Sequence, residues 1–251
     1  MLTQYNARPA HTDRPALYSS FARSPSEVRE AQALRYRIFA EEMGARLHNR
    51  DGLDRDGFDP FCEHLLVRDR DSGKVVGTYR ILSPAMASAA RGYYSAGEFD
   101  LGRLQHLFDH TVEVGRACVH SDYRNGSTIA LLWAGLARYM QLNRYEYLIG
   151  CASISMADGG HLAAGLYNRL KHEHLAPAEY RAQPHCPLPM EVLRQNLAAP
   201  CPPLIKGYLR LGAYICGEPA WDPDFNTADL LIMLPMSRIK QRYASHFLRQ
   251  P

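Results

Sequence analysis

The clearest pattern in the chain is a helical stripe of apolar residues that begins near Ser127. Apolar side chains recur there at positions 129, 132, 133, 136, 137 and 140, which matches the 3.6-residue period of a helix with one buried face. A second helix is predicted to begin after Ser24, where a capping serine, a proline at the first helical position and Glu27 at the third form a capping box. A third helix is predicted over residues 161–171.

Short runs rich in β-branched residues separate these helices and predict strands. Residues 65–68 and 75–82, joined by the turn Asp71-Ser72-Gly73, form a predicted hairpin. Further strands are predicted over residues 111–119, 147–154, 204–216 and 230–234. Because strands and helices interleave without a regular βαβ repeat, the predicted fold class is α/β, with a mixed sheet and helices packed on it.

The remaining segments lack such periods. Residues 1–23 mix Pro, Arg, Thr and Ser and are predicted to be a flexible N-terminal tail or lid, so that residues 24–251 form a single domain. Residues 44–59 are rich in Gly, Asn and Asp and predict a surface loop. Residues 177–203 hold seven of the 16 prolines and predict an irregular connection.

Composition narrows the class of protein. With 46% hydrophobic and 22% charged residues the chain is an ordinary globular protein. A net charge of +3 is too small to predict a nucleic-acid-binding protein but suits an acidic partner. No apolar run approaches the roughly 20 residues of a membrane span, and no signal peptide is visible, so we expect a cytoplasmic protein. The six cysteines form no CxxC pair and no HExxH motif occurs, so we expect neither disulfides nor a metal site.

The basic, amphipathic segment 237–249 has two interpretations. It is typical of a helix that rests on an anionic membrane surface, and also of a plain surface helix.

Glu113 is the lone acid in the apolar run 111–119. Burial raises the pKa of a carboxyl group toward a value useful for a general base. The alternative is a structural ion pair with Arg116 or Arg80. Strand alternation places Glu113 and Arg116 on opposite faces, so they meet only if the strand bulges, for which Gly115 is suited.

A strand, a short turn and a helix start follow one another closely after Glu113. The N–H groups and dipole at such a helix start can bind an anion such as a phosphate. The alternative is a simple N-cap with a solvent-facing Arg124. The candidate phosphate-binding residues are Val119, Arg124, Gly126, Ser127 and Thr128.

Five further motifs occur in a characteristic order. They are Arg35-Tyr36-Arg37-Ile38-Phe39, Asp56 with Asp59, Phe61 to Val67, Gly77-Thr78-Tyr79-Arg80 and Glu113 to Val119. With Arg124 to Thr128, a contracted form of the GNAT loop Arg/Gln-x-x-Gly-x-Gly/Ala, this order resembles two sister families. These are the ornithine acyl-carrier-protein N-acyltransferases of ornithine-lipid synthesis and the acyl-homoserine-lactone synthases. The segments 149–154, 206–213 and 217–229 resemble the first family.

The resemblance implies a GNAT-like fold and an enzyme that makes lyso-ornithine lipid. A (3-hydroxy)fatty acyl group would pass from the phosphopantetheine of acyl carrier protein to the α-amine of L-ornithine, without a permanently bound cofactor. The shortened loop favours a carrier protein over CoA. Two alternatives stay open: another amine acceptor, such as glycine, lysine or a homoserine-lactone precursor, and a non-catalytic module that binds acyl carrier protein or lipid.

The resemblance also suggests roles for single residues. Glu113 would be the base, assisted by Arg116 and Arg80, and Arg80 would bind the acceptor carboxylate or order the loop that ends at Asp59. Arg35, which shares a helical face with Phe39, could pair with Asp56 or Asp59. These two aspartates would hold the acceptor or form Asx turns. His64 is a second base candidate, although a hydrogen-bonded edge histidine is favoured.

Overall fold

The fold is built on a mixed β-sheet, seen in a computed structural model that describes residues 16–47 and 51–239. Eight strands follow the order β1-β2-β3-β5-β6-β10-β8, with β9 also paired to β10. Neighbours are antiparallel except β5 and β6, so the predicted mixed sheet is confirmed. The strands are β1 (Leu17–Phe21), β2 (Glu63–Asp69), β3 (Val75–Leu82), β5 (Thr111–Val119), β6 (Tyr147–Ser155), β8 (Tyr214–Ile215), β9 (Ala220–Asp222) and β10 (Thr227–Pro235), and a small second sheet pairs β4 (Phe99–Asp100) with β7 (Gln183–Pro184).

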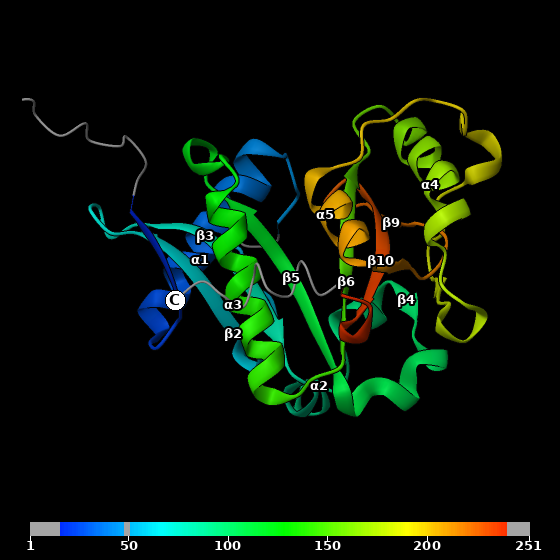
Figure 1. The fold of residues 1–251 in the computed structure, drawn as a ribbon. Coiled ribbons are helices and arrows are strands. Elements are labelled where there is room, and N and C mark those ends of the chain that lie inside the picture. Colours follow the sequence, from blue (N-terminus) through cyan, green and yellow to red (C-terminus); the bar gives the residue numbers. More distant parts are fainter. Residues whose placement is uncertain (1–15, 48–50, 240–251) are drawn as a thin grey trace, which may run out of the picture.

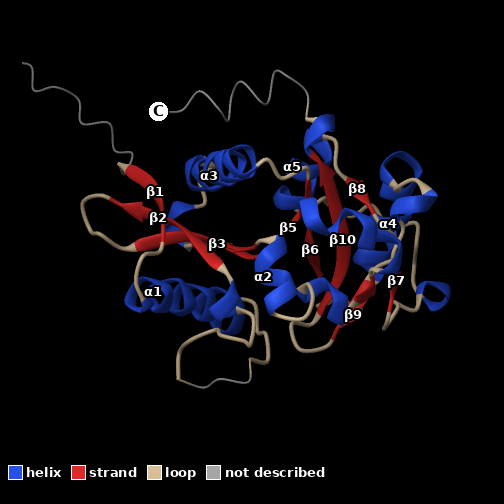
Figure 2. Cartoon of the chain, turned by 90° about the horizontal axis from the view of Figure 1, so that it is seen from below, coloured by secondary structure: helices blue, strands red, loops and turns tan. Residues whose placement is uncertain are grey.

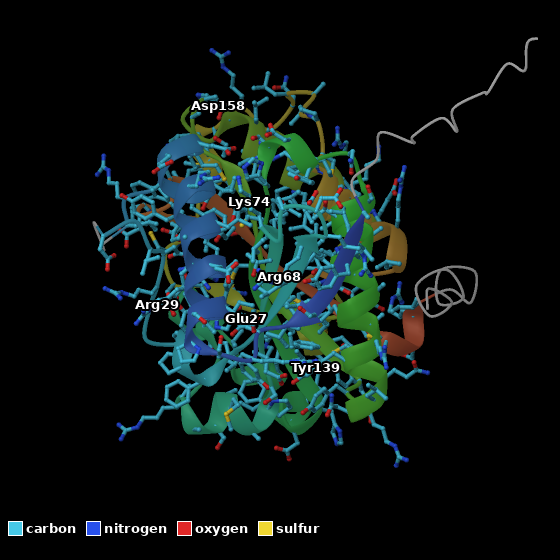
Figure 3. The ribbon with its side chains drawn as sticks, turned by 90° about the vertical axis from the view of Figure 1, so that its left-hand side faces the viewer. Glu27, Arg29, Arg68, Lys74, Tyr139 and Asp158 are labelled. Atoms are coloured by element: carbon cyan, nitrogen blue, oxygen red, sulfur yellow. The ribbon has the colours of Figure 1, made fainter. Side chains whose placement is uncertain are left out.

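Helices cover both faces of this sheet. Figure 2 shows α1 and α3 on opposite faces of the β1-β2-β3 part, and Figure 1 places α4 and α5 beside the β6-β10 part. Arg68 of β2 binds Glu27 and Glu30 of α1 and so ties that helix to the sheet (Figure 3). The helices are α1 (Pro25–Tyr36), α2 (Pro84–Ala89), α3 (Ser127–Asn143), α4 (His161–His174) and α5 (Pro203–Leu211), and a π-helical turn (Arg37–Glu42) continues α1.

The predicted helix starts are confirmed. Ser24 Oγ accepts a hydrogen bond from the Glu27 backbone N–H, which caps α1. The apolar stripe of α3 is buried at Leu132, Leu136 and Met140. Burial of such a stripe on the sheet supplies most of the stability of a helix in a folded protein.

The strand predicted over residues 204–216 is wrong. The segment forms helix α5, which buries Ile205, Tyr208 and Leu211 at three-residue spacing, and only β8 is extended. Gly212 ends α5 in the left-handed region with φ +105°, a conformation that glycine adopts easily. A short apolar run does not distinguish a strand from one face of a helix, which explains the error.

The predicted N-terminal tail is too long. Its residues Leu17–Phe21 form the edge strand β1, paired antiparallel with β2 from Leu17↔Asp69 to Phe21↔Leu65. The sequence Leu-Tyr-Ser-Ser-Phe has no apolar–polar alternation that would predict a strand, in agreement with its five half-buried side chains. Residues 1–15, and the part of the basic segment 237–249 beyond Ile239, lie outside the described residues.

Strands β5 and β6 pair only at one end. Their parallel register covers Thr111–Glu113 and Tyr147–Ile149, although β5 continues to Val119 and β6 to Ser155. The two ribbons diverge from there (Figure 1). A bulge in β5 accompanies the divergence, because Thr78↔Cys118 and Arg80↔Gly115 leave two residues of β5 opposite one of β3. A bulge bends its strand, and it places Arg116 at φ +50°. The sheet is therefore open between β5 and β6.

Gly77 allows α3 to pack closely on β3. A Cβ at this position would lie 2.5 Å from Thr128 Cγ2 and 3.4 Å from Leu132 Cδ1. We expect Gly77→Ala to lower the free energy of unfolding by about 1–3 kcal/mol through overpacking, as measured by urea denaturation. Thr128→Ser removes the clashing methyl group and should restore part of that loss. Gly57→Ala, with nothing within 4 Å of its Cβ, is the matched control. A double variant no more stable than Gly77→Ala would contradict this account.

Candidate active site

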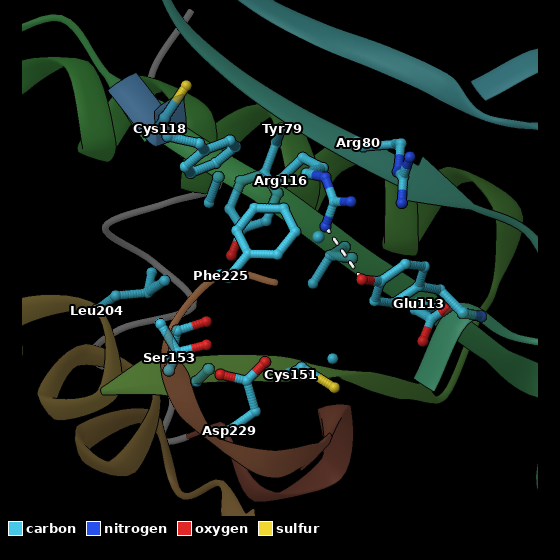
Figure 4. Close-up of a pocket in the computed structure, with 18 of the residues that line it drawn as sticks. Tyr79, Arg80, Glu113, Arg116, Cys118, Cys151, Ser153, Leu204, Phe225 and Asp229 are labelled. Carbon is cyan, nitrogen blue, oxygen red and sulfur yellow. Dashed lines mark hydrogen bonds between the residues drawn. The ribbon is translucent and has the colours of Figure 1, made fainter. Parts of the chain in front are cut away.

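The opening between β5 and β6 holds a cavity of about 500 Å³. Its volume lies in the range of small-molecule binding sites. One wall is β5 from Glu113 to Val119, and the opposite wall comes from β6 and β10 (Figure 4). Phe39 of the turn after α1 and Tyr208 of α5 also line the cavity. The divergence of two neighbouring strands is thus what creates the site.

Glu113 lies in the wall where the two strands separate. Its Oε2 accepts a hydrogen bond from Tyr94 N at 2.6 Å, and its Oε1 accepts from Ser95 N at 2.7 Å and from Ser95 Oγ. Burial raises the pKa of this carboxyl group, while the bonds from Ser95 and Tyr94 act in the opposite direction. A carboxylate has about four lone-pair positions, so one remains for a ligand or water.

The predicted alternative of an ion pair between Glu113 and an arginine is not found. Among the described residues, neither Arg80 nor Arg116 lies within 4.0 Å of the Glu113 carboxylate. The bulge that such a pair required does occur, but it directs Arg116 toward Asp54 and Asp56 instead, at 3.2 Å and 3.3 Å. Arg116 also lies over the ring of Phe225.

Three arginines and three aspartates form a buried network behind this wall. Arg35, fully buried, binds Asp54 at 2.7 Å and Asp59 at 2.9 Å. Arg80 binds Asp56 at 2.7 Å and Asp59 at 3.2 Å. Of the two partners predicted for Arg35, Asp59 is found and Asp56 is not, and Asp54 was missed. Although burial raises the pKa of Asp59, the hydrogen bonds and charge of Arg35 lower it to about 2.

The network leaves Asp59 no free oxygen for a ligand. Gln32, Arg35 and Arg80 all donate to its carboxylate, and it is not among the cavity-lining residues. Asp56 also stands outside the lining and binds Arg80 and Arg116. The two aspartates therefore fix the arginines of the wall.

His64 is buried beside this network. Its Nε2 lies 3.4 Å from the backbone carbonyl oxygen of Asp59, and burial lowers its pKa. It does not line the cavity. The favoured interpretation as a hydrogen-bonded histidine agrees with this placement, but the predicted edge position is wrong, because β2 lies between β1 and β3.

Of the five candidate phosphate-binding residues, two line the cavity, and Gly126, Ser127 and Thr128 at the start of α3 do not. Val119 and Arg124 line it, and the exposed Arg124 also binds Glu42. Gly126 caps the helix at φ +89°, and Ser127 donates from N and Oγ to Asn125 Oδ1. The Thr128 side chain does not contact a ligand site, because it is buried against Gly77 and donates to the Tyr123 carbonyl oxygen.

The chain is similar to a known family of acyltransferases. Residues 34–134 match the family model described as acetyltransferase (GNAT) domain. An L-ornithine N(alpha)-acyltransferase of Agrobacterium fabrum is 40% identical over 249 residues, which span 92% of this chain and 85% of that protein. The chain belongs to the L-ornithine N(alpha)-acyltransferase family.

Solved structures agree with a GNAT fold for this L-ornithine N(alpha)-acyltransferase family member. FeeM, an N-acyl amino acid synthase from uncultured soil microbes, aligns with a TM-score of 0.53 at 14% identity over 90% of this chain and 94% of its own. BjaI, a CoA-dependent acyl-homoserine lactone synthase, aligns with a TM-score of 0.52 at 17% identity over 93% and 88%. The predicted family and the acyltransferase class are confirmed, and the fold is shared with an acyl-homoserine lactone synthase. Within the described ranges, no helix has the length and apolar character to cross a membrane.

The sequence missed several residues of the acyltransferase site. Tyr94 and Ser95, which hold Glu113, begin a single 3-10 turn (Tyr94–Gly97), which is too short to leave a periodic signal in the sequence. Asp229, which lines the cavity, was also missed. Asp229 stands just before the apolar run 230–234 and is, like Glu113, an acid in an otherwise apolar strand, so the sequence pattern does indicate it. Phe39 was found: it lines the cavity, with its ring edge-on to Phe225.

Proposed function

We propose that this enzyme transfers a (3-hydroxy)fatty acyl group from acyl carrier protein to the α-amine of L-ornithine, the first step of ornithine-lipid synthesis. The supporting observation is the open β5–β6 cavity with a buried carboxylate in its wall, in a chain 40% identical to a protein named L-ornithine N(alpha)-acyltransferase.

The open strands suit an extended thioester arm. Beyond Glu113 and Ile149 the facing edges of β5 and β6 are not paired with each other, so their backbone groups are available to a pantetheine chain. At the mouth, Arg124 and the first turn of α3 provide a guanidinium and backbone N–H groups for its phosphate. Next to Val119 and His120, the exposed Arg37 and Arg124 offer guanidinium groups to an acidic carrier protein, which would compete with Glu42 for Arg124.

The acceptor reacts at Glu113. Its carboxylate, directly or through a water, removes a proton from the α-ammonium group, and the neutral nitrogen attacks the thioester carbon. The new C–N bond forms, the C–S bond breaks, and the leaving carrier thiolate takes up the proton that the attacking nitrogen loses as it becomes an amide. Arg116, held by Asp54 and Asp56 in the cavity wall, binds the acceptor carboxylate, while Arg80 fixes Asp56 and Asp59. The acyl donor brings its own phosphopantetheine, and the proposed steps use no other cofactor.

The product carries a fatty tail and belongs at a membrane. We place the enzyme in the cytoplasm, with the basic segment 237–249 in peripheral contact with anionic lipid.

A competition assay tests the proposal. Purified enzyme receives 3-hydroxyacyl groups on acyl carrier protein or, separately, on CoA, with an equimolar mixture of ornithine, lysine, glycine and homoserine lactone. Mass spectrometry should find α-N-acyl-ornithine as the main product and a higher rate with the carrier protein. Preferred acylation of another amine contradicts the acceptor, and a higher rate with CoA contradicts the donor. Binding of acyl carrier protein with no product from any amine would indicate a non-catalytic module.

A further inference from the structure

Two carboxyl groups, Glu98 and Asp229, lie side by side across the cavity from the arginine network. Their oxygens and Cys151 Sγ all lie within 4.8 Å of one another. Asp229, from β10, is only 4% exposed and lines the cavity, whereas Glu98 precedes β4. In Figure 4 Asp229 and Cys151 face the cavity from the side opposite Arg80 and Arg116.

These acids have no cation to neutralise them. Asp229 Oδ1 and both oxygens of Glu98 are buried and have no hydrogen-bond partner among the described residues. The described arginines and lysines form no ion pair with either group. The nearby Asp222 adds negative charge, and its Oδ1 accepts from the backbone N–H groups of Asp224 and Phe225. Buried carboxylates left unpartnered are unfavourable unless a proton or a cation joins them.

The titration of the pair agrees with this reasoning. Burial, together with the charges of Asp229 and Asp222, raises the pKa of Glu98 to about 9. Burial and the charge of Asp222 also raise the pKa of Asp229 to about 6, although hydrogen bonding to Ser153, Thr227 and Glu98 acts in the opposite direction. At neutral pH the pair therefore retains a proton, which a ligand cation can replace.

A short polar path joins the acids to the base. The Cys151 thiol donates to Ser95 Oγ at 3.5 Å, and Ser95 Oγ donates to Glu113 Oε1. Cys151 Sγ in turn lies within 4.8 Å of the two acids. The site thus has one carboxylate, Glu113, that can act on an amine. Two further carboxyl groups, linked to it through Ser95 and Cys151, can bind a second cation.

A second cavity reaches the pair from another side. It has a volume of about 410 Å³ and is lined by Glu98, Trp221 and His185, and it shares Phe58, Tyr94 and Asp222 with the first. The acids therefore lie between the two cavities, where a small polar molecule can arrive without passing through the donor groove.

We propose that Glu98 and Asp229 bind the side-chain ammonium group of a diamino-acid acceptor and so select it over neutral amino acids. The inference rests on the proposed function, whose acceptor has such a group. The α-amine lies at Glu113, the carboxylate at Arg116, and the methylene chain passes over Cys151. A divalent metal is the alternative cation for the same three side chains, and metal analysis of the purified enzyme distinguishes it from an ammonium group.

The test compares ornithine with 2-aminopentanoic acid, which is ornithine without its terminal amine. Wild-type enzyme should prefer ornithine in kcat/KM by about 100-fold or more, because the analogue leaves buried polar groups unpaired. Asp229→Asn and Glu98→Gln should each reduce kcat/KM for ornithine about 30-fold or more, while the value for the analogue stays the same or rises. The control Glu173→Gln, whose side chain is 82% exposed, should leave both values unchanged.

Several outcomes overturn the inference. A wild-type enzyme that acylates both amino acids equally well refutes it whether or not the variants fold, yet leaves N-acyl transfer in place. Equal losses for both substrates in the variants indicate a structural pair. Stoichiometric bound zinc in the purified enzyme, lost in Asp229→Asn, indicates a metal site. If neither amino acid is acylated while another amine is, the proposed function itself fails.

Discussion

Glu113→Gln should lower kcat by about 10²- to 10⁴-fold, the usual contribution of a general base. The amide keeps one acceptor oxygen, for Ser95 N and Oγ, and nearly the same volume, but its NH2 group replaces the oxygen that accepts from Tyr94 N. Circular dichroism of the variant should therefore first show that it is folded. KM for the acyl donor should change little, because the thioester arm binds the strand edges and the start of α3. Steady-state kinetics with acyl carrier protein and ornithine provide the measurement.

The pH dependence gives a second measure of the same role. A base works when deprotonated, and the pKa of Glu113 is raised above its ordinary value of 4.5. The wild-type rate should therefore increase with pH through that raised pKa, and this acidic limb should disappear in Glu113→Gln. Glu146→Gln, altered at a side chain 62% exposed, is the control and should retain the limb. If Glu113→Gln keeps wild-type activity and the same pH profile, Glu113 is not the base.

Arg35→Met should lower the free energy of unfolding by about 3–5 kcal/mol. The guanidinium is fully buried between Asp54 and Asp59, and its removal leaves charged groups without their partner. Urea unfolding followed by circular dichroism measures the change. The matched control is Arg55→Met at the exposed pair with Asp51, where both side chains are nearly half exposed and the loss should be about 0–1 kcal/mol. Equal losses in the two variants would contradict a special role for the buried network.

The effect of Arg35→Met should depend on pH. The pKa of Asp59 falls from 3.8 to about 2 in the folded protein, so this carboxylate contributes stability above about pH 4. That contribution is lost as the pH falls through 2, because the protonated acid no longer attracts Arg35. The stability difference between wild type and variant should shrink over this interval. A difference that stays constant from pH 5 to pH 2 would exclude Asp59 as the main partner.

The strands and helices that sequence predicts best are those with a complete period or a complete cap. The strand predicted over residues 111–119 agrees with β5, and the helix predicted from Ser127 agrees with α3. The errors occur where the apolar pattern is short or fits a strand and a helix equally well. Residues 204–211 are apolar enough for a strand, and only packing of Ile205, Tyr208 and Leu211 against the core decides for a helix.

Several residues that line the cavity were predictable from the sequence, but the residues that hold them in place were not. Glu113 stood out because an acid in an apolar strand requires an explanation, and Phe39, Arg80, Arg116 and Arg124 also line the cavity. Tyr94 and Ser95, which bind Glu113, reach it only through tertiary folding. Thr128 shows the opposite limit, since its side chain, predicted to face a phosphate, serves the packing of α3 on Gly77.

The separation of β5 from β6 also has a consequence for aggregation between molecules. Unsatisfied strand borders normally recruit strands from other chains and begin aggregation. Here the two incomplete borders face each other across an internal cavity, and the outer limits of the sheet are the short strands β1, β8 and β9. The protein can thus offer unpaired backbone N–H and C=O groups to an extended ligand without exposing them at the outer edges of its sheet.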